Sequence, residues 1–179
     1  MTRRLPLPAV AVLLAAGCGG AVRSGAEAGQ WPGRLHRLPP WRTGVPALAV
    51  NVPDDYEKGL RAGEDFLVHL FRRPPDKAPA ESATLVVYVG HHPRAPRAKT
   101  LAEPGRIAGR EVTWFGDTWR DEGGRQTYYA EAQVRGLFAW PRCWRPGAQG
   151  LVVHVMAWGT DQEEVQRLMA AAESLRLAP

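Results

Sequence analysis

Two thiols and several imidazoles are the groups in this sequence that could do nucleophilic or metal chemistry. Cys143 lies in the stretch "AWPRCWRPG", with an arginine on either side within two positions. Nearby cations lower the pKa of a thiol and make it a nucleophile. A lone cysteine among tryptophans also fits an inert, small apolar residue. We predict the inert role for Cys143, and keep an enzyme that uses it as the alternative.

Four of the five histidines lie in or directly after apolar segments that are typical of strands: His69, His91, His92 and His154. Imidazole nitrogens ligate zinc and copper, so a cluster of these residues could hold a metal ion. Neighbouring residues of an extended chain point in opposite directions, however, and no cysteine or carboxylate stands at ligand spacing beside the pair at 91 and 92. We predict no metal, and keep a histidine-bound metal centre as part of the enzyme alternative.

The familiar catalytic motifs are absent from the sequence. It contains no GxSxG, HExxH, CxxC or phosphate-binding loop. None of its three serines stands where a strand-to-helix elbow would activate it. We therefore predict no catalytic residue and no cofactor, and expect a non-enzymatic protein.

A basic segment follows the pair of histidines. Its side chains are Arg94, Arg97, Lys99, Arg106 and Arg110, with Glu103 as the one acidic residue among them. Guanidinium groups bind phosphate and carboxylate in bidentate fashion, so this segment is a candidate anion-binding site for an acidic envelope polymer or a phospholipid surface. Trp114 and Trp119 could add stacking for a sugar. The same charges also fit a loop that keeps strand edges from aggregating.

The first residues carry the features of a secretory signal. Two arginines precede an apolar run at residues 5–16, which is too short to cross a bilayer as a helix. Small residues then lead to Cys18 in "LLAAGCGG", which resembles the lipobox of bacterial lipoproteins. The resemblance implies cleavage after Gly17 and a diacylglyceryl group, with palmitate-type acyl chains, on the Cys18 thiol. Glycine rather than aspartate follows, which implies an outer-membrane anchor facing the periplasm in a Gram-negative cell.

Composition and patterning divide the chain into three parts. The chain has 179 residues, of which 45% are hydrophobic and 23% charged, as expected of a globular protein. A net charge of +5 is too low to predict nucleic-acid binding. We predict a signal peptide at 1–17, a flexible tether at 18–44 and a single α+β domain at 45–179, because glycine and proline dominate the second part. The segment near Trp41 is expected to pack on the domain.

The sequence predicts that the domain is a mainly antiparallel sheet of about six strands. Apolar or alternating runs cover residues 45–53, 65–71, 84–90, 105–115, 126–134 and 151–159, and turn residues rather than helices separate them. Residues 160–177 predict an amphipathic helix packed across the sheet, with Thr160 as its N-cap and Glu163 completing a capping box. Residues 54–63 are a candidate for a second, shorter helix.

The order of these elements resembles the PsbP-like fold. The motifs are "NVPDDY", "EDFLVHLF", "LVVYVG" followed by "HHP", "AGREVTWF", and a closing helix that ends in "SLRL". The resemblance implies an antiparallel α/β sandwich and a binding, accessory or assembly role without catalytic residues. We therefore expect an envelope lipoprotein whose partners are the membrane, through its anchor, and an acidic envelope polymer or an envelope protein.

Overall fold

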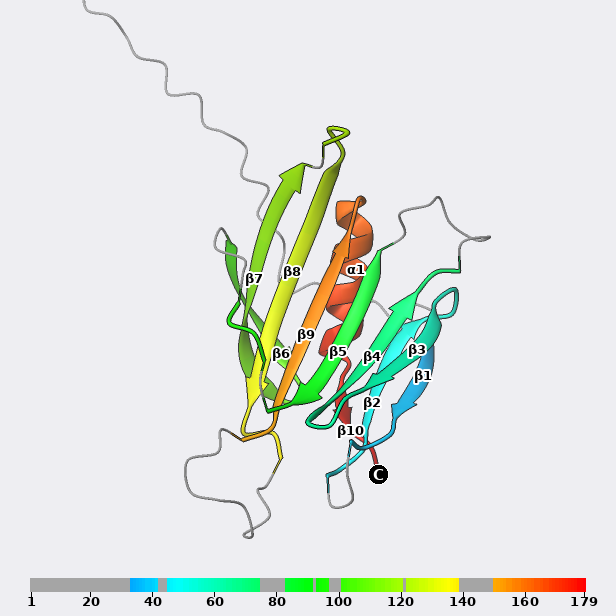
Figure 1. The fold of residues 1–179 in the computed structure, drawn as a ribbon, viewed down its shortest axis with the longest axis vertical. Helices are drawn as coiled ribbons and strands as arrows, with labels where there is room; N and C mark the ends of the chain where they lie inside the picture. The colour runs from blue at the N-terminus through cyan, green and yellow to red at the C-terminus, as the bar shows by residue number, and fades with distance from the viewer. Residues whose placement is uncertain are drawn as a thin grey trace, which may run out of the picture.

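The computed structural model describes residues 33–41, 45–74, 83–91, 93–96, 101–120, 122–138 and 150–179. Within these ranges the chain forms one large sheet, one small sheet and one helix (Figure 1). The predicted signal peptide, Cys18 and Cys143 lie outside the described residues, so the structure does not test the predictions made for them.

The large sheet has seven strands, and every neighbouring pair is antiparallel. In spatial order they are β3 (Glu57–Ala62), β4 (Phe66–Arg72), β5 (Thr84–Gly90), β9 (Val152–Gly159), β8 (Gln126–Arg135), β7 (Arg110–Arg120) and β6 (Leu101–Ile107). The valine-rich strands β5 and β9 lie near the centre and are almost wholly buried, as expected of strands covered on both faces.

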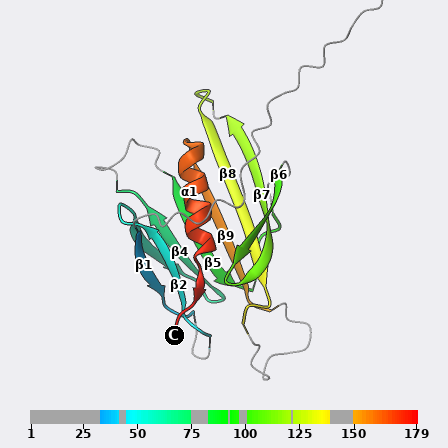
Figure 2. The same ribbon diagram turned by 180° about the vertical axis from the view of Figure 1, so that it is seen from behind.

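The small sheet consists of β1 (Gly33–Leu38), β2 (Leu48–Pro53) and β10 (Arg176–Leu177), in the order β1-β2-β10. It covers the same face of the large sheet as the helix (Figure 2). Residues 33–38 therefore belong to the folded part, whereas their glycine- and proline-rich surroundings predicted a tether up to residue 44. Residues 33–38 are folded because they pair with β2 along their whole length, and Leu38 is buried there. Trp41 packs against the core, as predicted.

Helix α1 (Gln162–Glu173) lies across the large sheet, as predicted. Its N-cap is Asp161 rather than Thr160, because the Asp161 carboxylate accepts a hydrogen bond of 2.9 Å from the backbone N–H of Glu163. The helix is also shorter than predicted, since residues 176 and 177 leave it to form β10 beside β2. No helix in the described part of the chain is both long and apolar enough to span a membrane.

One hydrophobic core lies between the large sheet on one side and α1 with the small sheet on the other. It unites residues that are far apart in sequence, such as Val50 of β2, Val87 of β5 and Leu168 of α1, all fully buried. The apolar face of the predicted amphipathic helix packs there. Of its five residues only Met169 is half-buried, and the others are buried: Val165, Leu168, Ala172 and Leu175.

The α+β class, with a mainly antiparallel sheet and a C-terminal helix, is confirmed, but the number of about six strands is wrong. The described residues form ten strands in two sheets. The run at 105–115 belongs to two strands, β6 and β7, because Ala108 and Gly109 both have positive φ angles and turn the chain between them. The candidate helix at 54–63 is also wrong, since β3 occupies it as an exposed edge strand paired with β4.

Candidate functional site

The two faces of the large sheet have different surroundings. In β9, Val153, Val155 and Ala157 point into the core beneath α1. Alternate residues of a strand point to opposite faces, so His154, Met156 and Trp158 lie on the other side, which we call the outer face.

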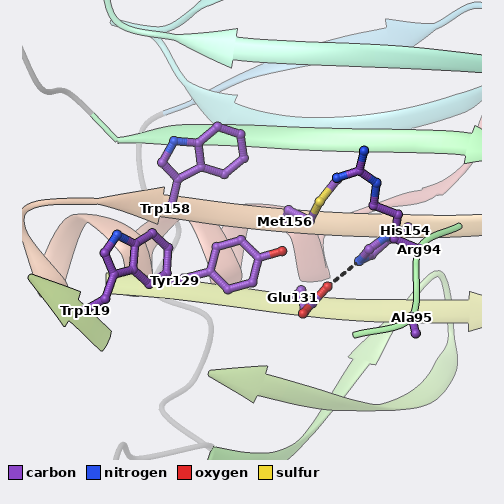
Figure 3. Close-up of a pocket in the computed structure, with 8 residues that line it drawn as sticks. All are labelled: Arg94, Ala95, Trp119, Tyr129, Glu131, His154, Met156 and Trp158. Carbon is purple, nitrogen blue, oxygen red and sulfur yellow. Dashed lines mark hydrogen bonds and ion pairs between the residues drawn. The ribbon is translucent and has the colours of Figure 1, made fainter. Parts of the chain in front are cut away.

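The outer face carries a pocket of about 270 Å³, which we call the outer-face pocket. Eight residues line it, and Figure 3 shows them together: Arg94, Ala95, Trp119, Tyr129, Glu131, His154, Met156 and Trp158. They come from three adjacent strands, β7, β8 and β9, and from the segment that follows β5.

One end of the outer-face pocket is aromatic. Tyr129 and Trp158 are direct partners in the ladder between β8 and β9. Trp119 lies beside Tyr129, with ring centroids 5.8 Å apart and planes tilted by 48°. The Trp119 side chain is 46% exposed, so a large part of its ring faces solvent. Trp119 and Trp158 each bring an indole N–H, a hydrogen-bond donor, to the lining of the pocket.

The other end is polar and buried. His154 Nε2 lies 2.7 Å from Glu131 Oε2, and the two residues are only 3% and 1% exposed. Burial lowers the pKa of His154, although the hydrogen bond and the charge of Glu131 act in the opposite direction. Burial therefore favours the neutral form of the imidazole, which shares a hydrogen bond with the Glu131 carboxyl group through its Nε2.

The segment after β5 covers this polar end. Gln133 of β8 donates a hydrogen bond of 2.7 Å from its Nε2 to the backbone oxygen of Arg94, which holds the segment against the sheet. Figure 3 shows the Arg94 side chain beside His154 and Met156. Arg94 thus adds a guanidinium group, with several N–H donors, to the lining of the pocket.

The structure separates the basic residues that the sequence grouped together. Arg94 lines the outer-face pocket, whereas Arg106 is exposed beside Glu111 at 4.0 Å, and Arg110 donates a hydrogen bond of 3.4 Å to the backbone oxygen of Gly136. Neither of the latter two lines the pocket. Arg97 and Lys99 lie outside the described residues.

The two tryptophans suggested for stacking also differ. Trp119 lines the outer-face pocket, as a ligand platform requires. Trp114 is buried in the core, and its indole N–H donates to Glu173 Oε1 at 3.0 Å. It therefore packs the sheet against α1 and cannot stack on a ligand.

The histidines do not converge either. His69 is fully buried on the core face of β4, opposite Val87 in the ladder, while His154 lies on the outer face. The ring of His91 packs edge-on against Trp41 with centroids 5.2 Å apart. Among the described residues no group of three or more potential metal ligands comes together. His92 lies outside the described residues.

Sequence reasoning missed Tyr129, Glu131, Met156 and Trp158 as site residues. The sequence feature that could have indicated these residues is the alternation within residues 126–134 and 151–159. In each strand it places every second residue on the same face of the sheet. The sequence did not show that these two strands are neighbours, and that pairing is what creates the site.

Comparisons with known proteins add little to this geometry. No protein-family model and no curated protein matches the chain. A crystal structure from Bacteroides thetaiotaomicron VPI-5482 is similar with a TM-score of 0.49 and 12% sequence identity, over 83% of this chain and 49% of that one. This chain thus spans about half the length of that protein, and a similarity at this level carries no argument about function.

Proposed function

We propose that this protein is a lipid-anchored component of the bacterial cell envelope that binds a ligand in the outer-face pocket and is not an enzyme. The observation that carries the binding role is the pocket itself, in which three aromatic side chains and a buried carboxylate–imidazole pair meet on the outer face of the large sheet. Ligand sites are typically apolar hollows with a few well-placed polar groups.

The chemistry of the pocket favours binding over catalysis. Its described lining residues include no serine, threonine, cysteine or lysine that could act as a nucleophile. Glu131 lies in hydrogen-bond contact with the His154 imidazole, and with no serine, threonine, cysteine or lysine among the described lining residues we interpret this pair as a hydrogen-bonding surface for a ligand.

The anchor is proposed from the sequence around Cys18. In this proposal a signal peptidase cleaves after Gly17, and the Cys18 thiol carries a diacylglyceryl group through a thioether. Each buried methylene contributes about 0.8 kcal/mol, so two or more acyl chains hold the protein at the membrane stably. The domain would face the periplasm from the outer membrane of a Gram-negative cell.

We also propose that the domain has the PsbP-like fold. The confirmed features that support this assignment are the mainly antiparallel sheet and the closing helix that packs across it. Members of that family mostly bind or assist partners, which agrees with the binding role proposed for the outer-face pocket.

The anchor is tested by the intact mass of the membrane-extracted protein and by cell fractionation of Cys18→Ser. We expect the mass of the processed chain plus its acyl groups, and loss of the processed variant from the membrane fraction. A native mass equal to the bare polypeptide would contradict the anchor.

Binding is tested with low-molecular-mass and glycan fractions of envelope extracts, measured as the shift in melting temperature of the full chain. Ligands that bind the native state raise this temperature. We expect at least one fraction to raise it for the wild type and for Leu35→Ala, an exposed change on β1, but not for Trp158→Ala. If every active fraction also stabilises Trp158→Ala equally, the pocket is not the binding site.

A further inference from the structure

We propose that the ligand of the outer-face pocket is a neutral saccharide, a hexose or N-acetylhexosamine unit of an envelope glycan, whose apolar ring face stacks at the aromatic end while its hydroxyls meet the polar end. This inference rests on the proposed function and specifies its ligand.

The aromatic end fits the flat C–H face of a pyranose ring. Trp119, Tyr129 and Trp158 come from three neighbouring strands and form one apolar surface on the outer face (Figure 3). The tilt of 48° between Trp119 and Tyr129 shows that these two rings do not stack fully on each other. Part of the Trp119 ring therefore stays open to a ligand, at a position where burial of aromatic surface is favourable.

The polar groups fit a ligand that both donates and accepts hydrogen bonds. The indole N–H groups of Trp119 and Trp158 and the guanidinium of Arg94 are donors, while Glu131 is an acceptor. Sugar hydroxyls do both, so one ring can serve both kinds of group. A fatty acyl chain or a simple aromatic ring would remove these donors from water without replacing their hydrogen bonds, which costs free energy.

The charges around the pocket favour a neutral ligand. Among the lining residues Arg94 is the basic side chain, and Glu131 is the acidic one, paired with His154. Asp117 of β7 is the ladder partner of Tyr129 and adds negative charge on the same face. Arg135 of β8 lies on this face too, with its guanidinium against the side chain of Gln133. Basic and acidic side chains thus balance on the outer face, so a net charge on the ligand would gain little.

Titration calorimetry with the full chain tests the ligand class. The probes are chitotriose and maltotriose as saccharides, laurate and indole as apolar ligands, and inorganic phosphate as an anion. We expect one of the saccharides to bind and the other probes not to bind. The choice between chitotriose and maltotriose distinguishes an N-acetylhexosamine from a hexose.

Two substitutions locate the saccharide. Trp119→Ala and Trp158→Ala are each expected to weaken binding about two- to tenfold, which is the effect of losing one aromatic contact. Trp119→Phe keeps the ring face and should restore most of the loss, whereas Leu35→Ala on β1 should leave binding unchanged. Circular dichroism of each variant separates lost binding from lost folding.

Three results would overturn the inference. If laurate, indole or phosphate binds in a Trp158-dependent way and neither saccharide does, the ligand class is wrong and the proposed binding function stands. If a saccharide binds equally to Trp119→Ala and Trp158→Ala, the site is wrong. If no probe binds, the saccharide inference fails, and the melting-temperature experiment with envelope fractions decides the proposed function separately.

Discussion

Lowering the pH from 7.5 to 5 should destabilise this protein through His69. The side chain is fully buried on the core face of β4, and neither ring nitrogen has a hydrogen-bond partner within the described residues. Burial, helped by the charge of Lys58, lowers the pKa of His69 from 6.5 to about 4.

The size of this effect follows from the two pKa values. The unfolded chain takes up a proton near pH 6.5, while the folded protein resists protonation of His69 until about pH 4. The stability that depends on neutral His69 is therefore complete above pH 6.5 and is lost as the pH falls. At pH 5 the loss amounts to about 2 kcal/mol, and below pH 4 it levels off near 3 kcal/mol.

Urea unfolding followed by tryptophan fluorescence measures this loss at pH 7.5 and pH 5. His69→Leu and His69→Gln both remove the titrating group, so each should lose about 2 kcal/mol less than the wild type over this range. At pH 7.5 the leucine variant should match or exceed the wild type, because two unpaired polar atoms are gone, and the glutamine variant should be less stable. If the wild type and His69→Leu lose the same free energy, the burial argument is wrong.

Three further predictions concern stability, each measured by urea unfolding at pH 7.5. Tyr56→Phe should cost about 1–3 kcal/mol, because the Tyr56 hydroxyl donates a hydrogen bond of 2.7 Å to the buried carboxylate of Glu164. Gly105→Ala should cost about 1–3 kcal/mol, since its Cβ would lie 2.5 Å from the indole of Trp114. Asp161→Ala should cost about 0.5–2 kcal/mol through loss of the N-cap of α1.

Each of these changes has a matched control in the same chain. Tyr128→Phe removes a hydroxyl that has no hydrogen-bond partner among the described residues, and Gly150→Ala adds a methyl group into open space. Asp161→Asn keeps a side-chain oxygen that can accept the same hydrogen bond from the backbone N–H of Glu163. Controls that destabilise the protein as much as their partners would show that the named contacts do not carry the effect.

The pattern of apolar and polar residues was sufficient to predict the type and position of most individual strands and of the helix. The runs at 84–90 and 151–159 coincide with or closely cover β5 and β9, because buried strands need continuous β-branched residues. Apolar residues spaced three or four positions apart identified the buried face of α1. This pattern, like that of a buried strand, depends only on residues close together in the sequence.

Elements that depend on distant partners were predicted less well. Residues 33–38 become a strand only through pairing with β2, and residues 57–62 only through pairing with β4. Glycine and charge dominate both segments, so their own composition carries no strand signal. A glycine within a run, such as Gly109, marked a turn only once the backbone around it was known.

By itself the sequence determined the α+β class, the positions of the central strands, the buried face of the helix, and the proposal of a lipid anchor at Cys18. Only the tertiary structure decided which strands are neighbours, and with that the outer-face pocket. Glu131 and His154 lie 23 residues apart, and they meet because β8 and β9 pair in one particular register. Periodicity along a chain assigns a side chain to a face of its own strand, whereas a site is made by the order and register of several strands, which depend on the packing of the whole domain.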